Sequence, residues 1–256
     1  MADSVNIPRS SAAEKTTDIP ARHSLLVRIT HWITALSFFA LLLSGGEIVL
    51  SHPRFYWGEI GDDLTRPLFQ LPVPASRDLV PTGYHFVLPD QNGWSRALHF
   101  QAAWLLVFTG VLYLIWGLVS GHFRRSLFPN ASPARWRAAL VEHLRFRRPD
   151  PSQPQSYNPL QRLAYLIVIF ILFPLAVWSG LALSQTFDAI CPFAVQSLGG
   201  FQSARTIHFF DAIALTVFLV VHVVMIARAG FLRLTRAMIT GHLDAEPDNL
   251  TQQDQP

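Results

Sequence analysis

The chain has 256 residues, of which 50% are hydrophobic and only 14% are charged. Soluble domains carry about 25% charged residues, so this composition excludes an ordinary soluble enzyme. The apolar half of the chain also excludes overall disorder. A single cysteine, Cys191, excludes an intrachain disulfide, a cysteine-based zinc or iron–sulfur site, and covalent haem attachment through two cysteines. The net charge is +3, and its meaning depends on where the charges lie.

Four apolar stretches are long enough to cross a membrane, because a spanning helix needs about 20 mostly apolar residues. They cover residues 25–50, 97–120, 160–183 and 204–227. The first stretch is too long for the apolar core of a signal peptide, and no cleavage motif of small residues accompanies it, so we expect it to be retained. The sequence therefore predicts an all-α membrane protein built as a four-transmembrane-helix bundle.

The basic residues of the loops predict the orientation of the bundle. Segment 121–162 carries eight arginines against two acidic residues, which identifies it as cytoplasmic by the positive-inside rule. With four crossings, both termini then lie in the cytoplasm. The predicted organisation is a flexible N-terminus, a four-helix domain with a periplasmic and a cytoplasmic loop, and a C-terminal tail. Their ranges are 1–24, 25–230 (with loops 51–95 and 121–159) and 231–256.

Four of the ten histidines lie inside the predicted spans. Ionisable residues in a membrane are costly, so each is a candidate functional residue. His208 and His222 are 14 residues apart, which places them on one helix face about 21 Å apart, one near each surface of a hydrocarbon core about 30 Å thick. The first span starts in the cytoplasm and the second outside. Depth therefore pairs His31 with His222 and His99 with His208.

The chemistry of these pairs favours iron porphyrin. Paired imidazoles in an apolar four-helix bundle, without neighbouring carboxylate or cysteine ligands, suit two bis-histidine haems better than zinc or a di-iron centre. We predict two non-covalently bound b-type haems, with axial ligands from His31 and His222 and from His99 and His208.

Three arginines each precede an intramembrane histidine by three residues, on a neighbouring helix face about 4.5 Å closer to water. A guanidinium group there is well shaped to hold a haem propionate. The alternative is that these side chains only extend to the membrane interface. The arginines are Arg28, Arg96 and Arg205.

Three glycines lie within about 40° of the direction of a histidine on the same helix. A missing side chain at these positions lets a flat porphyrin approach the helix, and the alternative is close helix packing through small residues. The glycines are Gly45, which follows His31 and lies at the depth of the other haem, and Gly110 and Gly117, which follow His99.

Two acidic residues lie near the outer ends of the spans. Asp211 follows His208 by three residues, and we expect it to pair with Arg205 or Arg96, with proton transfer as the alternative. Glu47 is expected to be exposed at the outer end of the first span.

The histidine pattern resembles a known family. The His31-Trp32 pair, His99 early in the second span, a third span without histidine, and His208 with His222 in the fourth are similar to di-haem cytochrome b subunits of bacterial respiratory oxidoreductases. These are the cytochromes of nickel–iron hydrogenases and formate dehydrogenases, within the bacterial cytochrome b561 superfamily. The resemblance covers residues 24–230.

The resemblance implies a multi-pass protein of the bacterial inner membrane that passes electrons between a periplasmic redox protein and a quinone near the cytoplasmic haem. Substrate chemistry would then reside in another subunit. The expected partners are membrane lipid, quinone, and a molybdopterin oxidoreductase, hydrogenase or cytochrome c, and no nucleic acid. The long outer loop 51–95, rich in aromatic residues and proline, is most similar to cytochromes that accompany periplasmic molybdopterin oxidoreductases, and we expect it to dock the partner.

Two other classes stay open at this point. The chain could work alone as a quinol-oxidising cytochrome b561 that reduces a diffusible acceptor. It could also lack haem and be a transporter or membrane anchor whose histidines carry protons or bind substrate. A visible spectrum separates the last class from the other two.

Overall fold

The computed structural model describes residues 24–62, 64–73, 91–123 and 159–242. The predicted flexible N-terminus, apart from Ser24, lies outside the described residues. So do residues 74–90 of the predicted periplasmic loop, residues 124–158 of the cytoplasmic side and residues 243–256 of the tail.

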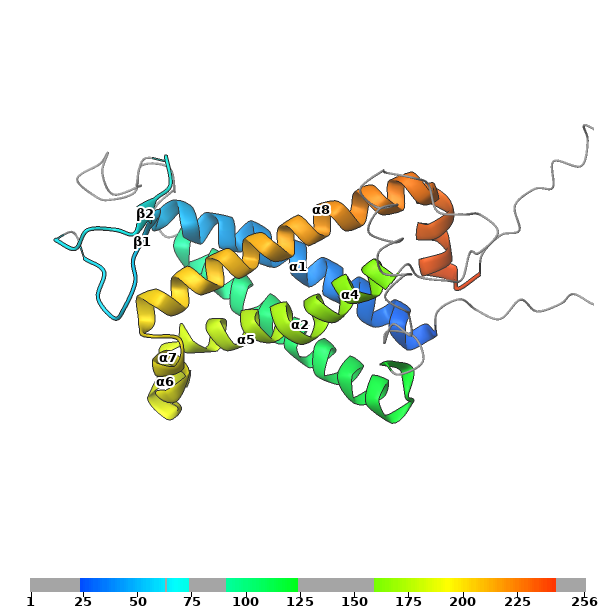
Figure 1. The fold of residues 1–256 in the computed structure, drawn as a ribbon, viewed down its shortest axis with the longest axis horizontal. Helices are drawn as coiled ribbons and strands as arrows, with labels where there is room; N and C mark the ends of the chain where they lie inside the picture. The colour runs from blue at the N-terminus through cyan, green and yellow to red at the C-terminus, as the bar shows by residue number, and fades with distance from the viewer. Residues whose placement is uncertain (1–23, 63, 74–90, 124–158, 243–256) are drawn as a thin grey trace, which may run out of the picture.

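The described residues form the predicted four membrane helices. These are α1 (Leu25–Ser51), α2 (Gln91–Val119), a composite third span that ends in α5 (Phe173–Ala182), and α8 (Phe201–Thr240). All four are long and apolar enough to cross a bilayer. The four-helix architecture predicted from the sequence is thereby confirmed, and the first and last described residues lie at the same end of the bundle (Figure 1).

The third span changes its helical form midway. It begins as α4 (Pro159–Ile167), continues through the π-helical turn η2 (Val168–Leu172), and resumes as α5. Pro174, at the start of α5, has no N–H to offer to the carbonyl group four residues earlier. A π turn is a local adjustment that re-pairs the backbone around such a proline inside a membrane.

The fourth helix is longer than its hydrophobic pattern predicts. The predicted span ends at residue 227, whereas α8 continues to Thr240 and kinks at Gly230, whose φ of 107° only glycine adopts readily. The first part of the predicted tail is therefore helical. It packs back on the start of α1, where the indole Nε1 of Trp32 donates to the carbonyl oxygen of Met238 at 3.3 Å.

Small residues let the helices pack in pairs. Helix α1 packs chiefly against α2, and α5 chiefly against α8. The buried residues of α1 recur every seven positions and are all small hydroxyl residues, which allow close approach of two helices in a membrane. They are Thr30, Ser37, Ser44 and Ser51.

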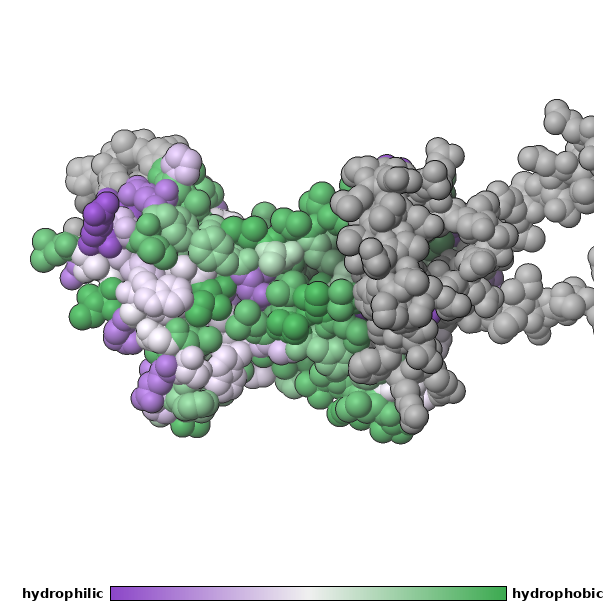
Figure 2. Space-filling model, in the orientation of Figure 1, coloured by the Kyte–Doolittle hydropathy of each residue, from purple (hydrophilic) through white to green (hydrophobic). Residues whose placement is uncertain are grey.

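Short elements gather at one end of the bundle, which we call the loop end (Figure 1). Strand β1 (Arg54–Phe55) pairs antiparallel with β2 (Phe69–Gln70), and the connection from α5 to α8 contains α6 (Gln185–Ile190) and α7 (Phe193–Ser197). Figure 2 shows hydrophilic residues gathered at the loop end and hydrophobic residues around the middle of the bundle. This distribution is that of a protein whose middle section faces lipid.

Candidate functional site

The structure brings together both histidine pairs that depth predicts. His31 of α1 faces His222 of α8 with ring centroids 6.4 Å apart, and the rings are inclined by 49°. His99 of α2 faces His208 of α8 at 6.2 Å and 68°. His99 and His208 lie nearer the loop end, so we call them the outer pair, and His31 and His222 the inner pair. Each pair joins α8 to the other helix pair, across an interface with few close backbone contacts.

These separations fit two imidazoles that share one iron. A metal–imidazole bond of about 2 Å and a distance of about 1.2 Å from the ligating nitrogen to the ring centroid place two such rings about 6.4 Å apart. Among residues 24–62, 64–73, 91–123 and 159–242, no three histidine, cysteine or acidic side chains gather as a cluster that could hold a metal ion. Pairs of histidines, with no third ligand, are the donor set of a bis-histidine haem.

Each histidine of the outer pair is supported by a serine from a neighbouring helix. The Oγ atom of Ser44 in α1 lies 3.0 Å from Nδ1 of His99, and the Oγ atom of Ser179 in α5 lies 2.9 Å from Nδ1 of His208. Both serines are fully buried. Because Nδ1 faces a serine, Nε2 is the nitrogen left for a metal.

Aromatic rings surround the inner pair instead. Trp32 meets the ring of His31 edge-on, with centroids 5.3 Å apart. Phe218 stacks on His222 at 5.7 Å and 21°, and Tyr165 meets the same imidazole at 6.2 Å. Such packing restricts the orientation of both imidazoles.

The predicted glycines have different surroundings. A Cβ atom on Gly45 would lie 3.5 Å from Cε1 of His99, so this glycine does lie beside a histidine of the other pair. No described atom lies within 4 Å of such an atom on Gly110. Gly117 lies under the ring of Phe123, and its missing side chain makes room for that ring. Its observed contact is therefore with a ring just beyond the end of its own helix, which is neither a histidine nor a second helix.

A fourth glycine was not predicted. A Cβ atom on Gly180 of α5 would lie 3.4 Å from Cε1 of His208. The third span has no histidine from which an angle could be measured. The signal that could have found Gly180 is the dipeptide Ser179-Gly180, which repeats Ser44-Gly45.

The three predicted arginines also differ. The guanidinium of Arg205 donates to the carbonyl oxygen of His52 and lies over the ring of Phe55, 4.9 Å from its centroid. Arg28 donates to the carbonyl oxygen of Ile239. Arg96 is exposed. In the structure, Arg205 and Arg28 thus hold other parts of the chain, in addition to any contact with a propionate.

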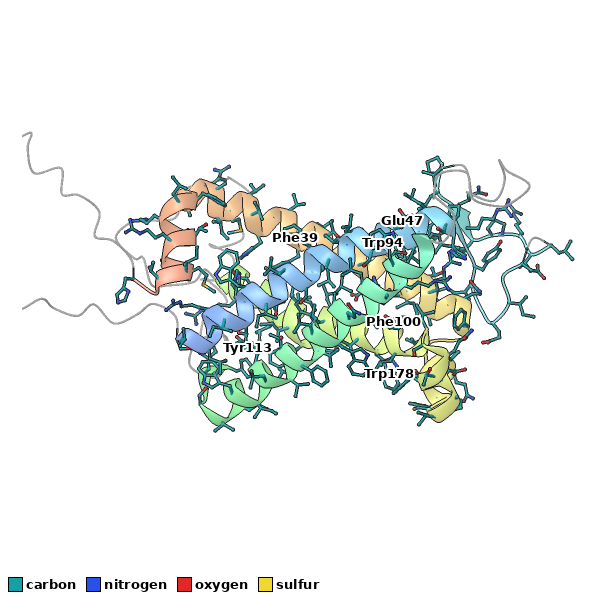
Figure 3. All side chains as sticks on the ribbon, turned by 180° about the vertical axis from the view of Figure 1, so that it is seen from behind. Phe39, Glu47, Trp94, Phe100, Tyr113 and Trp178 are labelled. Carbon is teal, nitrogen blue, oxygen red and sulfur yellow. The ribbon has the colours of Figure 1, made fainter. Side chains whose placement is uncertain are left out.

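The expected ion pair of Asp211 is not formed. Its side chain is 5% exposed, and neither carboxylate oxygen has a hydrogen-bond partner among the described residues. The pairing prediction was wrong because the guanidinium of Arg205 donates to His52 of the outer loop instead and Arg96 is exposed. Figure 3 shows Glu47 near the loop end of α1, where it is partly exposed.

The outer loop is anchored on the first turns of α8, a contact that sequence reasoning missed. The backbone N–H of Gly58 donates to Oγ of Ser203 at 2.7 Å, and the N–H of Gln202 donates to the carbonyl oxygen of Gly58 at 2.9 Å. The carboxylate of Glu59 accepts the N–H of Phe201 at 3.0 Å, which satisfies a free donor at the start of the helix. This part of the loop therefore lies against the helix that carries His208.

Comparisons with known proteins agree with the family that the histidine pattern resembles. The sequence profile of the family described as prokaryotic cytochrome b561 matches residues 22–241. A protein of Azospira oryzae named as a protein-methionine-sulfoxide reductase subunit, YedZ1, is 30% identical over 88% of this chain and 98% of its own length. A protein of Cupriavidus necator named as a Ni/Fe-hydrogenase B-type cytochrome subunit is 23% identical over 84% of this chain and 83% of its own. An Azotobacter vinelandii protein of the same name is 26% identical over 79% and 78%. No solved structure matches significantly.

Proposed function

The chain belongs to the prokaryotic cytochrome b561 family of membrane b-type cytochromes, and on this premise we propose that it relays electrons between a periplasmic redox partner and the quinone pool. The observation that carries the proposal is the presence of two facing imidazole pairs, at 6.4 Å and 6.2 Å, on one membrane helix bundle. The relay would use two b-type haems and run across the bacterial inner membrane. Bound haem supplies reversible one-electron transfer at its iron.

Different residues of the chain would have different roles in binding the two haems. Helix α8 contributes one ligand to each pair, and the 14 residues between His208 and His222 separate the two levels by about 21 Å. Gly45 and Gly180 keep the space beside the outer imidazoles free of side chains. Exposed Arg96, three residues before His99, is the proposed partner of an outer propionate.

We place the redox partner at the loop end, which is the proposed periplasmic side. Large apolar side chains of the outer loop are exposed there, among them Leu64 at 97% and Trp57 at 60%. Exposed apolar patches of this kind mark protein contacts. The same loop is bonded to α8 just before His208, so a partner seated on it is held close to the outer pair. The relatives named as reductase and hydrogenase subunits support an oxidoreductase as this partner.

The quinone is proposed to react near the inner pair, at the opposite end of the bundle. His31 and His222 lie among aromatic rings there, which suits a flat apolar ring. Both chain termini would then be cytoplasmic, in agreement with the arginine-rich segment 121–162.

The test is the visible spectrum and haem content of the purified protein. We expect a Soret band, a sharp reduced α band and two haems per chain. Replacing His99 or His208 with alanine should remove one haem, and replacing His31 or His222 should remove the other. The control is His242→Ala, because His242 is exposed and belongs to neither pair.

Colourless protein after reconstitution with hemin would overturn the proposal and favour a transporter or anchor. Two intact haem signals in a His31 and His99 double variant would overturn the assignment of ligands.

A further inference from the structure

The dipeptide Ser-Gly occurs at corresponding places in the two helix pairs. In α1 it is Ser44-Gly45, and in α5 it is Ser179-Gly180. Each serine contacts Nδ1 and each glycine lies beside Cε1 of one outer histidine. Two different helices thus make the same pair of contacts with the two imidazoles of the outer pair.

The direction of these hydrogen bonds follows from the serines themselves. A serine hydroxyl has a single hydrogen. That of Ser44 is directed to the carbonyl oxygen of Ala40 at 2.7 Å, and that of Ser179 to the carbonyl oxygen of Leu175 at 2.6 Å. Each Oγ thus lies closer to a carbonyl oxygen of its own helix than to the imidazole, 2.7 against 3.0 Å for Ser44 and 2.6 against 2.9 Å for Ser179, which favours Oγ as the acceptor and Nδ1 as the nitrogen that carries the proton. The lone pair then lies on Nε2, as an iron ligand requires.

We propose that Ser44 and Ser179 are positioning residues that fix the tautomer and orientation of both outer haem ligands and lower the midpoint potential of that haem. This inference rests on the proposed function. A hydrogen bond accepted from the far nitrogen makes a ligating imidazole more basic. A more basic ligand stabilises the ferric over the ferrous state, and hydrogen bonding around the ligands is a recognised way to tune haem iron.

A purely structural role explains these contacts less well. The hydroxyl group of each serine already has a hydrogen-bond partner in its own helix. Burying the serine therefore does not require a hydrogen bond to an imidazole. Ser37 provides a comparison: it lies two turns earlier on the same face of α1, is 3% exposed, and its hydroxyl has no hydrogen-bond partner among the described residues. Burial of a serine on this face therefore does not depend on a histidine.

The experiment is a redox titration of the purified holoprotein, with electron paramagnetic resonance of the oxidised haems. We expect Ser44→Ala and Ser179→Ala each to move the outer haem to a more positive potential and to change its g values. The double variant should show the larger shift. The matched control Ser37→Ala should leave both haems unchanged, and the inner haem should be unchanged in every variant.

Two results separate failure of this inference from failure of the proposed function. Wild-type potential and g values in both alanine variants would overturn the inference and leave the haem assignment intact, whereas absence of haem from the parent protein would overturn both. If Ser44→Ala loses the outer haem, Ser44→Thr retains a hydroxyl and should retain the haem. Loss in the threonine variant as well would assign Ser44 to packing and overturn the inference.

Discussion

Thr206 of α8 donates its hydroxyl hydrogen to the carbonyl oxygen of Tyr56 at 2.7 Å, in a contact that is fully buried. The two residues are 150 positions apart in sequence, and one belongs to the outer loop while the other lies two residues before His208. Thr206 thus ties the position of the loop to the helical turn that carries an outer ligand.

Replacing Thr206 with valine should weaken the attachment of the outer loop to α8. Valine has nearly the same shape but no hydroxyl, so the buried carbonyl oxygen of Tyr56 loses a partner, at an expected cost of about 1–3 kcal/mol. We expect a lower thermal unfolding midpoint and faster proteolysis of the outer loop, with Thr206→Ser as the control that keeps the hydroxyl. Equal behaviour of the valine variant and the parent would show that the bond does not hold the loop.

The glycines beside the outer pair should tolerate alanine but not a larger residue. A Cβ atom at Gly45 or Gly180 would make an ordinary contact of 3.5 or 3.4 Å with an imidazole, whereas the branched side chain of valine would push that imidazole away. We expect Gly45→Val and Gly180→Val to lose about half of the haem. Gly46→Val is the matched control, because Gly46 is exposed and no described atom lies within 4 Å of its Cβ position. Full haem content in both valine variants would contradict the close approach.

Removing the charge of Asp211 should stabilise the protein. Its carboxylate is buried without a hydrogen-bond partner in the described part of the chain, and a buried carboxylate in that state is costly. Asp211→Asn keeps the shape, and we expect it to raise the thermal unfolding midpoint, corresponding to about 1–3 kcal/mol. Asp188→Asn in α6, a partly exposed position, should change little. A lower midpoint for Asp211→Asn would show that the carboxylate makes a favourable interaction.

The exposed apolar side chains of the outer loop should be needed for binding the redox partner but not for binding haem. Introducing charge by Leu64→Glu together with Trp57→Glu should weaken binding of the partner at least tenfold, because burying two unpaired carboxylates disfavours association. Co-purification and the rate of electron transfer from the partner measure this effect, and the haem spectrum of the variant serves as the control. Undiminished association with a normal spectrum would place the docking surface elsewhere.

Helix periodicity and membrane depth predicted the spans and the residues that share one level of the bundle. The four spans, the two histidine pairs and the proximity of Gly45 to the outer pair follow from length, a rotation of about 100° per residue and membrane depth. For Gly117 the same angle was available, but an angle does not tell whether a porphyrin or a ring such as Phe123 fills the space.

The contacts that the sequence did not predict depend on which helices pack together and on how the loops fold back, and neither periodicity nor depth determines these. Ser179 and Gly180 gain their place only because α5 packs against α8. Arg205 turns to His52 because the loop folds back on α8, and this in turn leaves Asp211 without the predicted ion pair. The helix beyond residue 227 is polar enough to end a hydrophobic pattern, yet it is stabilised by contacts with the start of α1.

The kink at Gly230 also governs how a molecule can reach His31. Beyond it, the last turns of α8 fold over the beginning of α1 and are held there by Trp32 and Arg28. Leu232 on this segment is 81% exposed, as expected for a helix lying in the headgroup layer. We expect these turns to shield the beginning of α1 from bulk water, so that a compound dissolved among the lipid tails would reach His31 from between the helices.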